Sequence, residues 1–460
     1  MHLGKTSAGL KIIIVGAGKV GTSLVEQLSQ EGHDITLIDK NPVKLRETAE
    51  IYDVMGIVGN GASYTTLSEA GISSADLIIA VTPSDELNLL CCTVATQFNN
   101  CASIARVRTP DYSKDVGYLR EKLGLAMIIN PELEAAKEMA RILYLPTALE
   151  VSSFAHGQAE MIKIKIPEGN ILNDMTVATL GSNITNDILI CAVERDGEVT
   201  IPGGTFVLKN GDIISVVGNR TSTATFLKKI GFKTKSVKST MIIGGGRSSY
   251  YLANQLIKNG IEVKIIESNK TRCEQLNELL PKALIINGDG TNTDLLKEEG
   301  IDKVESFVAL TGMDEQNVML TLHASQTAGT KVITKINRMG FNDVISNMDL
   351  GSVIYPKYIT SETIVAYVRA RNASKSSEIE TLYHMFKSRV EAIEFRVNEE
   401  SKVTGKPLRE LPLKKGLLLS FISRGGKIII PSGNDEIKVG DTVMVVTTHT
   451  GFKELKDILR

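Results

Sequence analysis

The sequence predicts an α/β protein in which a parallel-sheet domain and a smaller α+β domain follow each other twice along the chain. The first observation is a glycine-rich turn that occurs twice, as IIIVGAGKVG at residues 12–21 and as MIIGGGRSS at residues 241–249. The second is that GNGASYTTLSEAGISSADLIIAVTPSDELN from Gly59 matches GDGTNTDLLKEEGIDKVESFVALTGMDEQN from Gly288. The third is a later match of IPGGTFVLKNGD with IPSGNDEIKVGD. Repetition over this length indicates two copies of one ancestral unit.

Each half opens with short β-branched segments separated by helical ones. In the first half we expect strands at residues 11–16, 34–39, 54–60, 76–82 and 103–108, and helices at 21–32 and 84–99. Strands that alternate with helices form a parallel sheet covered on both faces. Residues 10–143 and 239–369 are therefore predicted to be the two parallel-sheet domains.

The remainder of each half changes to strand pairs joined by polar turns. In the first half these are residues 159–170, 188–202 and 211–219, followed by a helix at 221–231. We expect small α+β domains at 148–231 and 379–460, a solvated linker at 232–240 and a hinge at 371–378. The repeated Gly-Asp pairs at 211–212 and 440–441 are typical of tight turns, and ligand binding is the less favoured interpretation of them.

The composition argues against several classes of function. The 52 basic and 53 acidic residues nearly cancel, so no net field favours nucleic acid as a partner. The longest apolar runs fall well short of the roughly 20 residues that span a bilayer. The N-terminal segment lacks the pattern of a cleavable signal, so secretion is not expected. The five cysteines show no paired spacing, and we expect small buried residues and no metal site.

The first glycine turn carries the full GxGxxG pattern between a strand and a helix. Gly16 permits the tight turn, Gly18 lets a pyrophosphate approach the backbone, and Gly21 lets the helix pack closely on the strand. The helix N-terminus offers N–H groups to phosphate. The candidate phosphate-binding residues are Gly16, Ala17, Gly18, Lys19 and Val20.

Asp39 ends the second predicted strand, 21 residues beyond Gly18. A carboxylate at this point accepts hydrogen bonds from both ribose hydroxyls and repels a 2′-phosphate. The spacing therefore predicts a Rossmann-like site for NAD(H) or an adenine nucleotide rather than NADP(H). The alternative is that Asp39 only caps the following helix.

Further polar groups follow other strands of the same sheet. They are Asn60 within a Gly-Asn-Gly turn, Thr82 and Pro83 after the fourth strand, and Arg106 after the fifth. Because ligands of open parallel sheets lie beyond the carboxyl ends of the strands, we expect these groups to converge on the nucleotide. Arg106 is expected to bind phosphate, and a surface ion pair is its alternative role.

The second copy has Ser249 in place of the third glycine. We expect its helix to lie slightly further out and its phosphate cradle to be looser. The candidate residues of this site are Gly244, Gly245, Gly246, Arg247, Ser248, Glu267, Asp289, Thr311, Gly312 and Lys335. Lys335 keeps the charge of Arg106 without its bidentate fork. The prediction is a working but non-equivalent second site rather than a structural remnant.

No reaction centre accompanies these sites in the sequence. The six histidines are scattered, with His33 and His156 expected in exposed loops, and no GxSxG, HExxH or Walker motif occurs. Cofactor binding without an acid–base group indicates sensing, so no catalytic residue is predicted. The alternatives are a pyridine-nucleotide oxidoreductase with an unrecognised acid or base, and a nucleotide-binding scaffold without a transport role.

The order of these segments closely resembles the TrkA family. It runs from KIIIVGAGKVGTSLVEQLSQEGHDITLIDKN through SIARVRTPDY and NPELEAAKEMARIL to a β-rich domain, and then repeats. The resemblance implies tandem RCK (KTN) N domains and C domains, the latter of the RCK_C type, with NAD(H) and ATP or ADP as ligands at the residues given above. It further implies a cytoplasmic, homo-oligomeric regulatory subunit, peripheral on the inner face of the cell membrane. Such a subunit gates an integral membrane potassium channel or transporter subunit of the TrkH or TrkG type.

The helix expected after residue 131 carries an apolar face. Its members are Leu133, Ala136, Met139, Ala140 and Leu143. This face packs either on its own domain or against another subunit, and the sequence favours neither. In the expected mechanism, a nucleotide across the strand ends shifts the angle between lobes, and that angle pulls on a channel.

Overall fold

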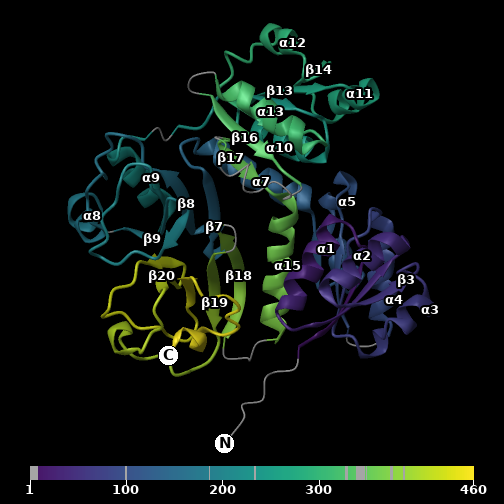
Figure 1. The fold of residues 1–460 in the computed structure, drawn as a ribbon, viewed down its shortest axis with the longest axis horizontal. Coiled ribbons are helices and arrows are strands. Elements are labelled where there is room, and N and C mark those ends of the chain that lie inside the picture. The colour runs from purple at the N-terminus through teal and green to yellow at the C-terminus, as the bar shows by residue number, and fades with distance from the viewer. Residues whose placement is uncertain are drawn as a thin grey trace, which may run out of the picture.

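The computed structural model folds into two similar halves, each with a parallel and an antiparallel sheet (Figure 1). It describes residues 9–98, 101–185, 187–232, 235–326, 330–337, 348, 350–372, 377–386 and 389–460. We call the parallel-sheet units the first and second N domains and the antiparallel units the first and second C domains. The predicted fold class is thereby confirmed.

The first N domain has a six-stranded parallel sheet. Its strands are β1 (Lys11–Val15), β2 (Asp34–Asp39), β3 (Met55–Val58), β4 (Leu77–Ala80), β5 (Ala102–Arg106) and β6 (Met127–Ile129). They lie in the order β3-β2-β1-β4-β5-β6. Its helices are α1 (Lys19–Gln30), α2 (Pro42–Tyr52), α3 (Tyr64–Glu69), η1 (Ile72–Ser74), α4 (Asp85–Thr96), α5 (Pro110–Lys114) and α6 (Val116–Lys122). Strand β4 is buried along its whole length because helices cover both faces of the sheet.

The second N domain repeats this arrangement. Its strands are β12 (Ser239–Ile243), β13 (Glu262–Glu267), β14 (Leu284–Asn287), β15 (Ser306–Ala309), β16 (Lys331–Lys335) and β17 (Ser352–Ile354). Their order is β14-β13-β12-β15-β16-β17, again with parallel pairing. Its helices are α10 (Arg247–Lys258), α11 (Lys270–Leu279), α12 (Thr293–Glu298) and α13 (Asp314–Ser325).

Each C domain is a five-stranded antiparallel sheet. The first contains β7 (Glu150–Phe154), η2 (Ala155–Gly157), β8 (Ala159–Lys165), α8 (Val177–Asn183), β9 (Ile188–Arg195), β10 (Glu198–Thr200), β11 (Ile213–Gly218) and α9 (Arg220–Lys229). The second contains β18 (Ser377–Met385), β19 (Val390–Val397), η3 (Leu408–Glu410), β20 (Leu417–Arg424), β21 (Lys427–Ile429), β22 (Thr442–Thr447) and η4 (Leu455–Ile458). The strand orders are β10-β9-β11-β8-β7 and β18-β19-β22-β20-β21.

The repeated Gly-Asp pairs of the C domains are turns, as predicted. Gly211 has a φ of 88°, a conformation that favours glycine. Asp212 accepts the N–H of Lys209 at 2.8 Å and the guanidinium of Arg195 at 2.7 Å. Asp441 is held in the same way in the second copy. These carboxylates therefore fix the turn in front of the following strand.

Two long helices connect the halves by crossing between them. They are α7 (Pro131–Tyr144) and α15 (Pro356–Asn372). Ala136, Met139 and Leu143 of α7 share one core with Leu252 of α10 and Ile265 of β13. The apolar face of α7 therefore packs on the second half of the same chain, which is neither of the two partners that the sequence suggested.

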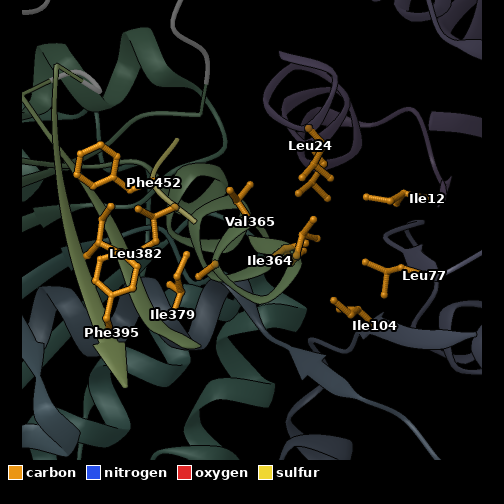
Figure 2. Packing of buried hydrophobic residues seen from close by; sticks show 14 of the residues in the cluster. Ile12, Leu24, Leu77, Ile104, Ile364, Val365, Ile379, Leu382, Phe395 and Phe452 are labelled. Carbon is orange, nitrogen blue, oxygen red and sulfur yellow. The ribbon is translucent and has the colours of Figure 1, made fainter. Parts of the chain in front are cut away.

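Helix α15 makes the reciprocal contact. In Figure 1 it runs between the first N domain and the C domains. Figure 2 shows Ile364 and Val365 between residues of the first N domain, such as Ile12 and Leu77, and residues of the second C domain, such as Phe395. One continuous core thus joins the first N domain to the second C domain.

The linker between the halves departs from the expected solvated connector at one residue. Val237 is buried, and its N–H donates to the carbonyl oxygen of Leu143 at 3.1 Å. The linker is therefore wrongly predicted as solvated at this residue, which belongs to the interface with α7. Residues 233–234 of the linker and 373–376 of the hinge lie outside the described residues.

The described residues contain no helix with both the length and the apolar character needed to cross a membrane. All five cysteines are free and buried, which confirms their prediction as small interior residues. Burial raises the pKa of the Cys91 and Cys191 thiols to about 12, so both are protonated and unreactive at neutral pH.

Candidate nucleotide-binding site

The first glycine turn has the geometry that its sequence predicts. Gly16 has a φ of 112°, in the region that favours glycine. A Cβ atom on Gly21 would lie 1.8 Å from the carbonyl oxygen of Gly16, so helix α1 packs against the turn only because residue 21 is glycine. A Cβ atom on Gly18 would meet nothing within 4 Å, which leaves this side of the turn open.

The second turn is wider, as expected from its serine. Ser249 is fully buried, and its hydroxyl donates to the carbonyl oxygen of Gly244 at 2.5 Å. The first turn has no room for a Cβ atom at the equivalent position, Gly21. Helix α10 must therefore lie further from its turn than α1 does from its own.

Each predicted ribose-binding carboxylate is hydrogen-bonded to the backbone of its own glycine turn. The carboxylate of Asp39 accepts the N–H of Ala17 at 2.6 Å and that of Asn41 at 2.7 Å. Glu267 accepts the N–H groups of Gly245 and Asn269 at the same two distances. Helix α2 is capped by the side chain of Asn41, so the alternative role of Asp39 as the cap is wrong.

One cavity of about 530 Å³ lies between the two glycine turns. Eleven of the predicted site residues line it. From the first set these are Gly16, Gly18, Lys19, Val20, Asp39, Pro83 and Arg106, and from the second Gly246, Arg247, Ser248 and Lys335. The sequence suggested two separate pockets, whereas the crossing helices bring both turns to a shared one.

The other predicted residues are not part of this cavity lining. They are Ala17, Asn60, Thr82, Gly244, Gly245, Glu267, Asp289, Thr311 and Gly312. Several stabilise their own loops. The N–H and hydroxyl of Thr82 both donate to Asn88, at 2.8 and 2.7 Å, and Thr311 binds Asn317 in the same way.

Arg106 and Lys335 lie at the carboxyl ends of equivalent strands. Arg106 donates to the carbonyl oxygen of Thr82 at 2.6 Å, while its Nε is buried without a hydrogen-bond partner. Burial, together with the nearby Arg108, lowers the pKa of Arg106 to about 10. Lys335 donates to the carbonyl oxygen of Leu310 at 3.0 Å, and burial lowers its pKa too. Both cations are thus desolvated without full compensation by negative charge, so an anion would stabilise them.

Each half also places a cation near the other half's strand ends. Burial is the largest cause of the lowered pKa of Arg106, and Arg247 of the second turn adds a smaller effect in the same direction. Lys19 of the first turn has the same effect on Lys335 and on Lys357. The electrostatic environment of each strand end therefore depends on residues of both halves.

Sequence reasoning missed several cavity residues. They are Asn41, Lys44, Arg108, Glu132, Asn337 and Lys357. A signal existed for Arg108, which stands two residues beyond Arg106. The residues at the start of the crossing helices gave no comparable signal, because their position depends on how the two halves pack together.

The ribose side of the second turn differs from that of the first. Arg272 Nε donates to the carbonyl oxygen of Gly245 at 2.7 Å, so this guanidinium lies against the turn. The equivalent residue of the first half is Lys44, which lines the shared cavity. The two copies are therefore non-equivalent at their ribose ends as well as at Ser249.

One histidine differs from expectation, and a second lies between two carboxylates. His33 is buried rather than exposed, and its Nδ1 accepts the N–H of Leu10 at 3.1 Å. His384 lies 3.5 Å from Glu362 and 3.3 Å from Glu391. Burial opposes its charge, but the hydrogen bonds to these carboxylates raise the pKa of His384 to about 9. The side chain of His156 lies outside the described residues.

Tandem Rossmann-like domains with opposed glycine turns, each followed by an antiparallel C domain, define a nucleotide-binding regulatory protein of the RCK type. The TrkA-N domain family matches residues 12–131 and 240–356, and the TrkA-C domain family matches 161–231 and 392–460. The chain belongs to the TrkA family. It is accordingly a regulatory protein of potassium uptake rather than an enzyme.

Full-length relatives support this assignment. The chain is 32% identical to "Trk system potassium uptake protein TrkA homolog 1" of Methanosarcina mazei, over 97% of this chain and 99% of the relative. It is 31% identical to "Trk system potassium uptake protein TrkA" of Haemophilus influenzae, over 95% of each.

Solved structures share the fold at lower identity. The "GsuK channel bound to NAD" aligns with a TM-score of 0.63 and 17% identity, over 97% of this chain and 78% of that one. The "GsuK RCK domain" aligns with a TM-score of 0.62 and 17% identity, over 96% and 93%.

Proposed function

We propose that this protein senses NAD(H) and ATP or ADP in the shared cavity. It would thereby gate potassium flow through an integral membrane subunit, docked at the inner face of the cell membrane. One observation carries the proposal: the cavity is strongly cationic and both glycine turns open onto it. Its basic side chains are Lys19, Lys44, Arg106, Arg108, Arg247, Lys335 and Lys357, against the acidic Asp39 and Glu132.

The helix ends at the cavity suit phosphate. Neither α1 nor α10 has a side chain that caps its N-terminus. The backbone N–H groups in the first helical turn of each therefore remain available to an anion. Asp39 at the cavity wall would accept a ribose hydroxyl once it exchanges its bond to Ala17. The GsuK channel, which shares the fold, has been solved with NAD, and this supports a dinucleotide as one ligand.

Helix α1 and a pair of buried ion pairs connect the first glycine turn to the second C domain. Helix α1 begins at the glycine turn and is followed by Glu31, which pairs with Arg369 of α15 at 2.5 Å. Arg369 also pairs with Glu391 of β19 at 3.1 Å. A nucleotide that repositions α1 would therefore act on the C domain through this contact, to the extent that it binds the two arrangements with different affinity.

Binding measurements with matched glycine variants test the proposal. Gly18→Asp and Gly246→Asp each place a carboxylate where a phosphate would approach, and neither Cβ atom meets anything within 4 Å. Calorimetric titration with NADH and with ATP should show weakened binding in each variant. Gly203→Asp, in an equally open position of the first C domain, is the control and should bind as the parent does. Equal binding in all three variants would overturn the site.

The membrane partner and the assembly need separate tests. Pull-down from native membranes with and without NADH, NAD and ATP should recover a potassium channel or transporter subunit in a nucleotide-dependent amount. We also propose a homo-oligomer, supported by exposed apolar residues at equivalent positions of the halves, Leu90 on α4 and Met319 on α13. Light scattering should give a mass above that of one chain, and Leu90→Glu with Met319→Glu should lower it.

A further inference from the structure

The two ends of the shared cavity carry opposite charges at one equivalent position. Helices α7 and α15 both begin with proline, Pro131 and Pro356, directly after or close to the last strand of their sheets. The residue after each proline lines the cavity, and it is Glu132 in the first half and Lys357 in the second. The halves thus differ here by two units of charge in otherwise similar settings.

Glu132 lies beside the cations of the first strand end. Its Oε1 is 3.8 Å from Arg108, and its Oε2 is buried without a hydrogen-bond partner. Arg108 also contacts Asp85, whose carboxylate accepts the backbone N–H of Arg108 at 2.8 Å and lies 3.5 Å from the guanidinium Nε. The charge of Arg108 is therefore largely balanced by these two carboxylates, and little of it remains for a ligand.

Lys357 has a different environment at the second strand end. Its Nζ lies 4.7 Å from the ring centroid of Tyr358, and burial lowers its pKa, with Lys19 acting in the same direction. The position equivalent to Arg108 is Asn337, which donates to Asp314 at 2.9 Å and brings no charge. Lys19 and Lys335 line the cavity at this end. The carboxylates that act on Lys357 are Glu26 and Asp314, which lie outside the cavity lining, so the lining itself has an excess of positive charge here.

We propose that Glu132 and Lys357 give the two ends of the cavity different phosphate selectivity, which extends the proposed function above. The end with Lys357 selects a nucleoside triphosphate, because the terminal phosphate meets an additional cation. The end with Glu132 selects a diphosphate such as ADP or a dinucleotide, because a terminal phosphate would meet a carboxylate. The cavity then binds two different nucleotides at the same time, one at each end.

ADP and ATP are the probes that isolate this effect, since they differ by one phosphate. In a partly solvated cavity, one unit of charge several ångströms from a phosphate changes affinity by roughly tenfold. The quantity to follow is therefore the ratio of ATP to ADP affinity at each end, which cancels effects common to both nucleotides.

The experiment is calorimetric titration of the full chain in two backgrounds. Gly18→Asp leaves the second end to be measured, and there Lys357→Gln should lower the ATP-to-ADP ratio about tenfold while Lys357→Arg preserves it. Gly246→Asp leaves the first end, and there Glu132→Gln should raise the ratio by a similar factor. Circular dichroism establishes that each variant is folded, and the two arms are independent if one variant fails to fold.

The outcomes separate this inference from the proposed function. Absence of ATP and ADP binding to the parent protein would overturn the proposed function, and this inference with it. Binding with ratios that stay unchanged in Lys357→Gln and Glu132→Gln would overturn the selectivity alone. A ratio that changes equally in Lys357→Arg and Lys357→Gln would assign the effect to packing rather than charge, and would likewise contradict it.

Discussion

Replacing Arg369 by methionine should loosen the junction between the first N domain and the second C domain. The Arg369 side chain is 4% exposed and pairs with Glu31, which is 14% exposed, and with Glu391, which is 1% exposed. Removing one member of a buried ion pair costs about 3–5 kcal/mol, because the remaining charge stays buried without its partner. His384 remains beside Glu391 at 3.3 Å, so we expect the lower end, about 3 kcal/mol.

Thermal unfolding followed by calorimetry measures this loss. For a cooperative unit of 150–250 residues, 1 kcal/mol corresponds to roughly 2–4 °C, so the transition of the joined domains should fall by about 6–12 °C. Lys122→Met is the control, since Lys122 and Glu121 form a pair that is 58% and 77% exposed. An exposed pair of this kind contributes less than about 1 kcal/mol. If Arg369→Met unfolded at the same temperature as Lys122→Met, the buried junction would carry no stability and the reasoning would be refuted.

Three further predictions follow from the geometry of the turns and the junction. Gly21→Ala should lower the unfolding temperature, because a Cβ atom at residue 21 would lie 1.8 Å from the carbonyl oxygen of Gly16. Gly18→Ala should leave it unchanged, because a Cβ atom there meets nothing within 4 Å. Equal effects of the two variants in a thermal scan would contradict this. Arg272→Ala should weaken ATP binding at the second turn, because it removes a cation that lies against the carbonyl oxygen of Gly245. Titration in the Gly18→Asp background measures this, and unchanged or stronger binding would contradict it. The pKa of His384 is raised to about 9, above its unfolded value, so charged His384 stabilises the folded protein fully at mildly acidic pH. This stabilisation declines as the pH rises through about 9. His384→Gln should remove that decline in unfolding temperature, and a decline that persists in the variant would contradict the assignment.

The glycine turns were predictable because their constraints are local. The spacing from Gly16 to Gly21, and from Gly18 to Asp39, follows from one strand, one turn and one helix. The wider second turn followed from a single serine hydroxymethyl group at Ser249. Such short-range sterics are readable from sequence alone.

The shared cavity was not predictable from the same information. It depends on α7 and α15 crossing between the halves, and an apolar helix face does not specify its partner. Val237 and His33 were misjudged for a related reason. Each lies in a polar segment of the sequence. Val237 is buried beside Leu143, which is distant in sequence, and His33 is buried beside Leu10 on a neighbouring segment.

The most direct test of the account is a structure of the full chain determined with ATP and NADH present. We expect phosphates against the amide groups at Gly18 and Gly246, close to Lys19 and Arg247, with a ribose at Asp39. Nucleotide found only outside the region between the two turns, or a cavity that stays closed by the protein's own side chains at saturating nucleotide, would contradict it.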